Sequence, residues 1–331
     1  MSAEGRSAVR MVDDRSAAAA WRAFAGTSSR RIAVDVIKRG DKSAVFRLRG
    51  AGPGRSGVVA KALLQDGLTV ERAVYDGLLP QLPVPALRCY GTTETTDGCC
   101  WIFLEDAGGR EYAPWSPRDR ALAARWLATV HAASARLRPP PSLPRRNARW
   151  YRTDVARVRE QLAAACNRRS LLPSDRRDLA GIVRHLDALA ADWSLLEADV
   201  SAIPQALVHG DFCAKNLRVR TVGGARQLAV FDWDAAAWGV CALDLASETL
   251  ESASPSPRVY WLTLRRSLPG VTPGIVRAAA TASAVLRLVA AMEWELAKSH
   301  RLRDPWTVAN LRDYGALMRD AIAAVRAGRN G

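Results

Sequence analysis

A change of pattern early in the chain constrains its fold more than any other feature. From residue 116 onward, apolar residues recur at helical spacing almost to residue 327. Before that point, short strand-forming runs are separated by turn-forming residues. These runs lie at 32–37, 43–50, 57–64, 86–90 and 99–104. The order predicts an α+β fold in which a small antiparallel β-sheet domain with one helix precedes a larger, mainly helical domain.

The same pattern places the boundaries of these parts. We expect residues 1–30 to form a lead-in with one short helix. Residues 31–106 are expected to form the β-rich domain, and residues 107–331 the helical domain. A short island of strand-like runs at 207–234 interrupts the helical part, and we expect it to lie inside that domain.

The composition excludes two broad classes of protein. The chain has 331 residues, of which 49% are hydrophobic and 24% charged, so it can bury a sizeable core and is not intrinsically disordered. The most apolar stretch, at 278–292, is interrupted by Arg287, and no signal sequence opens the chain, so we expect neither a membrane span nor secretion. The six cysteines lack metal-binding spacing, and we expect reduced thiols in the cytoplasm.

The charge of the chain is strongly positive. Lys and Arg number 48 against 33 Asp and Glu, which gives a net charge of +15, and all but five of the basic residues are Arg. We interpret this as a general preference for Arg, which makes each remaining Lys more informative. The excess favours anionic or neutral partners over cationic ones and would suit an acidic peptide or protein.

Two short apolar runs, 206–208 and 228–231, are followed by the strongest candidate site residues. Asp211 and Asn216 follow the first run and Asp232 follows the second, in the sequences HGDFCAKN and FDWD. Polar side chains beside buried strands need partners, because desolvation without compensation is costly. Amide and carboxylate oxygens are ligands that Mg²⁺ prefers when it is bound to a nucleotide. These residues therefore predict a site for a magnesium–nucleotide complex.

A lysine in an apolar strand is the next candidate. Lys61 lies within the run VVAKALL, where a buried ammonium group needs a carboxylate or phosphate partner. Glu71 follows ten residues later in the run TVERAVYDGLL, whose apolar spacing predicts a helix over 68–79.

Together these motifs resemble the aminoglycoside phosphotransferase and choline kinase group, a family with the protein-kinase-like fold. The family pattern is H-G-D-x-x-x-x-N, then a hydrophobic strand ending in D-x-D/E, then D-L-A. It is matched by HGDFCAKN at 209–216, FDWD at 231–234 and DLA at 244–246. The Lys61 and Glu71 runs and LATVHA at 127–132 match in the family's order. The resemblance spans about 35–250 and implies a bilobal fold, with a nucleotide-binding N-lobe and a helical C-lobe that carries the catalytic loop and the acceptor site.

The resemblance implies a catalytic role for three residues and a structural role for two. Asp211 would accept or orient the proton of the acceptor hydroxyl group. Lys61 would contact the α- and β-phosphates of ATP, positioned by an ion pair with Glu71. Asp244 would brace the catalytic loop through hydrogen bonds, and His209 would be a structural residue of that loop.

The resemblance also implies which residues bind the two cofactors, ATP and Mg²⁺. The metal ligands would be Asn216, Asp232 and Asp234. The nucleotide would meet a phosphate-covering loop at 39–46 and a hinge at 103–106, through Gly40, Ser43, Phe103, Leu104 and Glu105. The chain departs from the family in two places: the loop has a single glycine, and Gly239-Val240-Cys241 stands where G-D-P is usual.

The implied function is that of an ATP- and Mg²⁺-dependent kinase that moves the γ-phosphate to a hydroxyl group of a small molecule, such as an antibiotic, sugar or metabolite. Relatives that modify aminoglycosides need an acidic pocket for a polycationic drug. The helical part of this chain has no acidic excess, so we expect a different acceptor. An alternative acceptor is a Ser or Thr hydroxyl of a natural-product precursor peptide, as in a lanthipeptide-like or thioamide-peptide pathway.

Two further functional classes stay open. A pseudokinase scaffold or binding module would use the same fold to hold a partner, although every expected catalytic position is filled. Nucleic-acid binding would rest on charge alone, since aromatic residues are not interleaved with the basic runs, and we expect no specific nucleic-acid partner. His131 is expected to be a core or capping residue, and Cys213 a packing residue rather than a nucleophile.

Overall fold

The chain folds into two compact units, each assembled from segments far apart in the sequence. The first unit consists of Met1–Tyr112, Pro140–Leu143 and Lys215–Ala236. The second consists of Ala113–Pro139, Pro144–Ala214 and Ala237–Gly331. The computed structural model describes residues 9, 12–27, 32–40, 42–95, 99–168, 171–246, 252–297 and 305–328.

The first unit is built on a five-stranded antiparallel sheet in the order β1-β2-β3-β5-β4. Lys61 lies on the central strand, where it pairs with Val45 of β2 and Ile102 of β5. The pattern of strand-forming runs predicted five strands here, and the structure confirms them, although the fourth begins and ends later than the run at 86–90. They are β1 (Ala33–Arg39), β2 (Ser43–Arg49), β3 (Val58–Leu63), β4 (Cys89–Glu94) and β5 (Cys100–Glu105).

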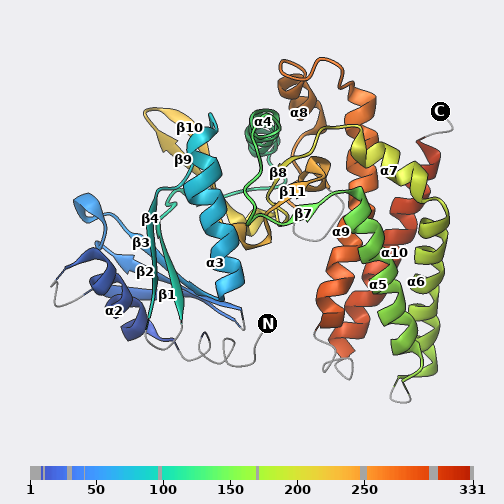
Figure 1. The fold of residues 1–331 in the computed structure, drawn as a ribbon, viewed down its shortest axis with the longest axis horizontal. Helices are drawn as coiled ribbons and strands as arrows, with labels where there is room; N and C mark the ends of the chain where they lie inside the picture. Colours follow the sequence, from blue (N-terminus) through green and yellow to red (C-terminus); the bar gives the residue numbers. More distant parts are fainter. Residues whose placement is uncertain are drawn as a thin grey trace. The chain divides into compact units, whose positions relative to one another are not determined.

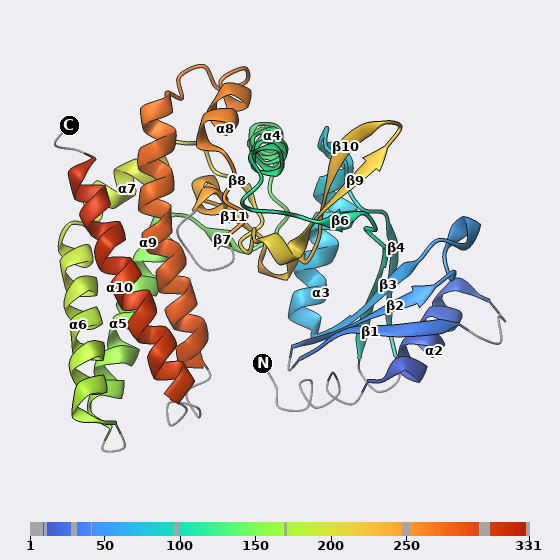
Figure 2. The same cartoon turned by 180° about the vertical axis from the view of Figure 1, so that it is seen from behind.

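Two helices lie on opposite sides of this sheet, as Figures 1 and 2 show. One is α2 (Asp14–Ala25) and the other is α3 (Gln65–Arg72), which begins shortly after β3 ends. A wider, π-helical segment at Ala73–Leu78 continues α3. The helix predicted over 68–79 is therefore present, although its second half has a wider turn than the α-helix that the spacing indicates.

The helix α2 completes the hydrophobic core on one face of the sheet. Its start is capped by Asp13, whose carboxylate accepts a hydrogen bond from the Ser16 N–H group at 2.7 Å. Trp21 is buried and packs edge-on against Phe103, with ring centroids 5.1 Å apart. The sequence predicts this helix but separates residues 1–30 from the β-rich domain, and the structure corrects that boundary because α2 belongs to the core of the first unit.

A second sheet in the first unit corrects the other expected boundary. β9 (Leu217–Val222) and β10 (Ala225–Val230) form an antiparallel hairpin, and β6 (Arg110–Glu111) pairs with β9. This hairpin belongs to the first unit, whereas the sequence places it inside the helical domain. The reason is non-local: β6 supplies an edge for the hairpin, and the turn after β10 packs against α3.

The second unit is mainly helical, as the spacing after residue 116 predicts. Figure 2 shows α5, α6, α9 and α10 side by side in this unit, and contacts join them pairwise. A small sheet in the order β7-β11-β8 lies in the same unit, with β7 (Arg145–Arg146), β8 (Ala206–Val208) and β11 (Ala237–Gly239). The helices are α4 (Pro117–Ser134), α5 (Ala148–Cys166), α6 (Pro173–Ala191), α7 (Trp193–Ser201), α8 (Pro257–Leu264), α9 (Pro273–Ala297) and α10 (Pro305–Ala327).

Local signals explain where several of these helices begin. Ser116 caps α4 and Ser256 caps α8, and in each case a proline occupies the first helical turn. Asn147 caps α5, where its side-chain oxygen accepts a hydrogen bond from the Trp150 N–H group at 2.9 Å. These polar residues satisfy backbone donors that a helix end leaves without intrahelical partners.

The long helix α9 is the most apolar segment of the described chain. By length and composition alone it would be able to cross a membrane, with a mean hydropathy of 1.6 over its most apolar window, which differs from the expectation that no stretch would approach a span. The core helix of a water-soluble protein satisfies the same criterion, and here α9 packs against α5, α7, α8 and α10.

Replacement of Trp21 should destabilise the first unit. Trp21→Ala removes a buried indole that packs on Phe103 and Tyr90, and we expect a loss of about 3–5 kcal/mol in the free energy of unfolding. Urea denaturation would measure it. The matched control is Trp115→Ala, since that side chain is 82% exposed and its loss should change stability by less than about 0.5 kcal/mol. Equal effects of the two substitutions would contradict the assignment of α2 to the core.

Candidate active site

The predicted site residues fall into two groups, one in each unit. Lys61, Glu71, Asn216, Asp232 and Asp234 lie in the first unit, together with the predicted nucleotide-binding residues of the sheet. Asp211 lies in the second unit, with the loop that follows β8.

Lys61 and Glu71 form a buried ion pair. The Lys61 Nζ atom donates to Oε1 of Glu71, and the two residues are 5% and 0% exposed. Because successive strand residues point to opposite faces, Lys61 emerges on the face of β3 that α3 covers. The pair joins the central strand to the helix and matches the contact that the family resemblance implies.

Asp232 is the second carboxylate on the same ammonium group. The Lys61 Nζ atom also donates to Oδ1 of Asp232, which follows β10. Asp232 adopts a left-handed backbone conformation, with φ +69° and ψ +62°, which costs a non-glycine residue about 1–2 kcal/mol. Such conformations concentrate at functional sites, where the surrounding structure holds them in place.

The carboxylates around Lys61 shift the pKa of its ammonium group, and the pKa of Glu71 is shifted as well. Burial lowers the pKa of Lys61, but Glu71, Asp232 and Asp234 outweigh that effect, so the pKa of Lys61 stands above its ordinary value. Burial raises the pKa of Glu71 to about 7, against the opposing effect of the Lys61 ammonium group. The directions agree physically, because two carboxylates contact one ammonium group and the charge of a third, Asp234, also acts on it. The carboxylate oxygens of this group are hard donors of the kind that a divalent cation prefers.

The donor set of this group fits a divalent cation bound with a nucleotide. Asn216 is buried and precedes β9, while Asp232 follows β10, and the Phe231 N–H group donates to the Asn216 carbonyl oxygen at 3.2 Å. The two residues therefore flank the same end of the hairpin, and Asp234 follows in an exposed turn. The described residues contain no cluster of three or more His, Cys, Asp or Glu that could hold a metal alone. Mg²⁺ does not need one, because it commonly takes one or two protein carboxylates and completes its coordination with phosphate oxygens and water.

The predicted phosphate-covering loop is the turn between β1 and β2. The Gly40 N–H group donates to the Ser43 carbonyl oxygen at 3.0 Å, and Ser43 begins β2 as a buried residue. A Cβ atom at Gly40 would make an ordinary contact, 3.5 Å from the Ser43 carbonyl oxygen, so the space around Gly40 does not require glycine. Asp41, the next residue of this loop, lies outside the described part of the chain.

Phe103, one of the three predicted hinge residues, points away from the Lys61 face. Ile102 pairs directly with Lys61 and shares its face, so the neighbouring Phe103 side chain lies on the other face. There its ring packs against Trp21 and Phe24 of α2, at centroid distances of 5.1 and 5.0 Å. Only the backbone of Phe103 is therefore oriented to serve a ligand on the Lys61 face.

The other two predicted hinge residues differ in their surroundings. Leu104 is buried, and it alternates with Phe103, so it shares the face of Lys61. Glu105 anchors neighbouring segments: it accepts a hydrogen bond from Arg220 Nη1 at 2.6 Å and one from the Arg88 N–H group at 3.1 Å.

In the second unit, Asp244 braces the loop that carries Asp211. Its two carboxylate oxygens accept hydrogen bonds from the backbone N–H groups of His209 at 2.7 Å and Gly210 at 3.0 Å. This is the contact that the resemblance implies, and it forms although Gly239-Val240-Cys241 departs from the family pattern. Gly239 is required there, because a Cβ atom would lie 1.9 Å from the Arg146 carbonyl oxygen.

Two histidines and a cysteine lie in or beside this loop. His131, at the end of α4, is buried, with Nε2 3.5 Å from Asp244 Oδ2 and Nδ1 2.9 Å from the Tyr260 hydroxyl group. It therefore supports Asp244 from within the core. His209 Nδ1 accepts a hydrogen bond from the Asp211 N–H group at 3.3 Å. Cys213 is buried, and its thiol donates to the Asp211 carbonyl oxygen at 3.3 Å and to Asp211 Oδ1 at 3.4 Å.

Sequence reasoning missed Arg287 as a site residue. Arg287 on α9 donates from Nη1 to the Gly210 carbonyl oxygen at 2.6 Å, and its Nη2 atom lies 3.6 Å from Asp211 Oδ1. The sequence signal for Arg287 is an isolated charge within an apolar stretch, at 278–292. A guanidinium group in such surroundings needs a partner, and the partner is the loop that carries Asp211.

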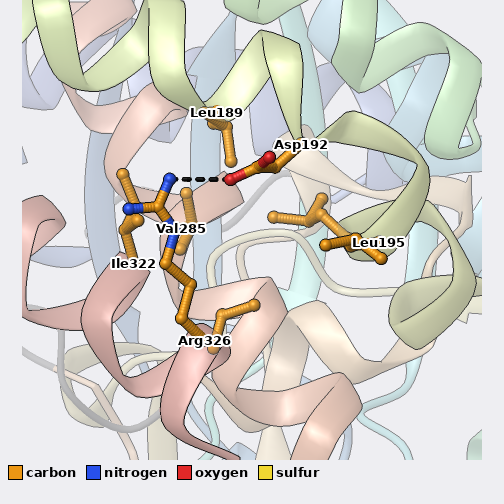
Figure 3. Close-up of a pocket in the computed structure, with 8 residues that line it drawn as sticks. Leu189, Asp192, Leu195, Val285, Ile322 and Arg326 are labelled. Carbon is orange, nitrogen blue, oxygen red and sulfur yellow. Dashed lines mark hydrogen bonds and ion pairs between the residues drawn. The ribbon is translucent and has the colours of Figure 1, made fainter. Parts of the chain in front are cut away.

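The second unit contains a cavity of about 320 Å³, and Figure 3 shows side chains that line it. The side chains of Asp192 and Arg326 meet beside it, with Arg326 Nη2 donating to Asp192 Oδ2 at 2.7 Å. The cavity is otherwise apolar, and none of the predicted site residues lines it. Its lining consists of Leu189, Asp192, Leu195, Leu196, Val285, Ile322, Val325 and Arg326.

Comparison with known proteins supports both the family and the fold. The model of the phosphotransferase enzyme family matches residues 22–249, more than half of the chain. A search of curated protein sequences finds no match. The family match bears out the resemblance to the aminoglycoside phosphotransferase and choline kinase group.

Solved structures share the fold at low sequence identity. The GDP complex of wild-type aminoglycoside 2'-phosphotransferase-IIIa has a TM-score of 0.64 and 14% identity, covering 95% of this chain and 99% of that chain. A microcompartment-associated aminopropanol kinase has a TM-score of 0.64 and 15% identity, covering 94% and 98%. The Plasmodium vivax ethanolamine kinase has a TM-score of 0.60 and 12% identity, covering 90% and 84%. These similarities confirm the predicted α+β fold of the protein-kinase-like type.

Substitution of Asp244 should loosen the loop that carries Asp211. Asp244→Asn replaces one accepting oxygen by an amide nitrogen that faces a backbone donor, and we expect a loss of about 1–3 kcal/mol in the free energy of unfolding. Urea denaturation and amide hydrogen exchange at Gly210 would measure it. Asp320→Asn is the control, because that side chain is 69% exposed. Unchanged protection of Gly210 in Asp244→Asn would show that the brace is dispensable.

Proposed function

The chain belongs to the phosphotransferase enzyme family, and we propose that it transfers the γ-phosphoryl group of ATP, with Mg²⁺, to a hydroxyl group of a small molecule. The observation that carries this proposal is the placement of Lys61 between Glu71 and Asp232. A buried ammonium group fixed by two carboxylates is preorganised to bind phosphate oxygens, and positioning of this kind is the main contribution of a protein to phosphoryl transfer.

Each residue of the first group has a part in holding the nucleotide. Lys61 would bind the α- and β-phosphates while Glu71 keeps its ammonium group in place. Asn216, Asp232 and Asp234 would hold Mg²⁺, which neutralises charge on the phosphate oxygens when it is bound. The chemistry of these side chains supports this assignment, because Mg²⁺ prefers carboxylate and amide oxygens as ligands.

Asp211 would act on the acceptor. In the proposed step, the acceptor hydroxyl oxygen forms a bond to the γ-phosphorus, and the bond from that phosphorus to the bridging oxygen breaks, so that ADP leaves. The hydroxyl proton passes to Asp211, which also orients the attacking oxygen. A carboxylate is a weak base, so its position matters more than its basicity in a loose transition state.

The charge near Asp211 supports a neutral or anionic acceptor. The Arg287 guanidinium group lies 3.6 Å from the Asp211 carboxylate and would repel a cationic acceptor group. Together with the net charge of +15, this favours an antibiotic, sugar or metabolite over a polycationic aminoglycoside. All six cysteines carry thiols rather than disulfides, which suits the reducing cytoplasm in which we propose that the protein works.

Phosphoryl transfer should depend on Asp211. Purified protein with Mg²⁺ and either ATP or GTP would be incubated with a panel of hydroxylated small molecules and Ser/Thr peptides, and phosphorylated products detected by mass spectrometry. We expect the mass of one phosphate to appear on a small molecule, and Asp211→Asn to lower the rate by about 10²–10⁴-fold. Asp187→Asn is the matched control in the same unit, since its side chain is 51% exposed.

The other outcomes of this experiment separate the alternatives. Transfer to a peptide would replace the small-molecule acceptor by a Ser or Thr hydroxyl group. Nucleotide binding without transfer to any acceptor would favour a scaffold. Transfer that survives in Asp211→Asn would remove Asp211 from the reaction.

Asp232 should control the response to Mg²⁺. Asp232→Asn is expected to weaken Mg²⁺-dependent ATP binding by at least about tenfold, since even residues that only support metal ligands change metal affinity by that much. Calorimetric titrations with and without Mg²⁺ would measure it. Asp76→Asn is the control, because that carboxylate is exposed and pairs only with Arg72 among the described contacts. An unchanged Mg²⁺ requirement in Asp232→Asn would exclude Asp232 as a metal ligand.

A further inference from the structure

Arg287 is an isolated charge on an apolar helix. It is the only charged residue of the stretch 278–292 in the middle of α9. Its side chain is 15% exposed, so most of the guanidinium group and its stem are removed from water. A buried charge at such a position is costly unless hydrogen bonds and an opposite charge compensate it. The partners of Arg287 therefore indicate why the residue is there.

Those partners are consecutive residues of the catalytic-loop segment. Nη1 donates to the carbonyl oxygen of Gly210 at 2.6 Å, and Nη2 lies 3.6 Å from Oδ1 of Asp211. The forked guanidinium group reaches a backbone acceptor and a carboxylate at once, which a lysine ammonium group does less well. The Asp211 side chain is 36% exposed, so its carboxylate is held on one side while it stays accessible on another.

The same peptide segment is fixed by a second charged side chain. Asp244 accepts hydrogen bonds from the N–H groups of His209 and Gly210, while Arg287 donates a hydrogen bond to the carbonyl oxygen of Gly210. The backbone that enters Asp211 is therefore held at its donors by an anion and at its acceptor by a cation. We expect the loss of Arg287 to deprive the Gly210 carbonyl group of this donor and to remove the cation from the Asp211 carboxylate, whose Oδ1 also accepts a hydrogen bond from the Cys213 thiol at 3.4 Å.

We propose that Arg287 is a positioning residue for Asp211, holding its carboxylate in the orientation that receives the acceptor hydroxyl group. This inference rests on the proposed function, in which Asp211 orients that hydroxyl group. A residue of α9 would then help to arrange the catalytic loop, although Arg287 lies outside the sequence motifs at 209–216, 231–234 and 244–246.

The test uses ATP hydrolysis, in which water takes the place of the acceptor hydroxyl group. Arg287→Met keeps the length of the side chain and removes its charge and donors. We expect kcat to fall by about 10–100-fold while KM for Mg²⁺·ATP stays within about twofold, because Lys61 and the metal ligands are untouched. Arg287→Lys keeps the charge and should recover at least about threefold of the lost kcat.

Two controls separate positioning from mere packing. Arg277→Met changes an exposed arginine of the same helix and should leave kcat unchanged. In the Asp211→Asn background, adding Arg287→Met should cause no further loss, since a residue that acts through Asp211 has nothing left to position. A packing defect would instead lower kcat again in the double variant and would be the same for Met and Lys.

The results that would overturn the inference are distinct from those that would overturn the proposed function. If Arg287→Met keeps wild-type kcat while Asp211→Asn loses it, Arg287 does not position Asp211 and the kinase assignment stands. If Met and Lys variants lose equal activity and both melt at lower temperature, Arg287 only stabilises the fold. If wild-type hydrolysis does not exceed that of Asp211→Asn, the proposed function fails and this inference fails with it.

Discussion

One ammonium group shared by two carboxylates holds together three elements of the first unit. Lys61 belongs to the central strand β3, Glu71 to α3, and Asp232 to the turn after β10, 171 positions further along the chain. Removing one partner of a buried ion pair typically costs about 3–5 kcal/mol, because it leaves an uncompensated charge. These three residues can therefore be buried only when the sheet, the helix and the hairpin pack together. The left-handed backbone of Asp232 is tolerated because its carboxylate completes this group.

In the second unit, buried charged side chains form hydrogen bonds with backbone groups instead. The loop before Asp211 is held by Asp244 at two N–H groups and by Arg287 at a carbonyl group. His131 lies behind Asp244, at 3.5 Å from its carboxylate, within the buried core. Lys61, Asp244 and Arg287 are each held by directed hydrogen bonds, so contacts that stabilise the fold also orient the candidate catalytic groups.

The resemblance to the family implied the pairing of Lys61 with Glu71. Local pattern indicated the strands of the five-stranded sheet and the helical character of the second unit, because each of these leaves a periodic signal in neighbouring residues. It was insufficient wherever a distant segment decides the outcome. Phe103 faces α2 because β5 pairs with β3 in a register that no single strand reveals. The hairpin joins the first unit because β6 offers it an edge. Arg287 meets the Asp211 loop from a helix 76 positions later, and its only local signal is a charge in apolar surroundings.

Because α2 covers one face of the sheet, it limits how far the protein can be truncated from its N-terminal side. The family match begins at residue 22, inside the helix Asp14–Ala25. A fragment trimmed to that match would lose the Asp13 cap and the buried Ala17, Ala20 and Trp21. The face of the sheet that carries Phe46 and Phe103 would then meet solvent, and an exposed apolar face of this kind promotes self-association. The start of the family match, at residue 22, is therefore not a suitable start for a fragment that keeps this face of the sheet covered.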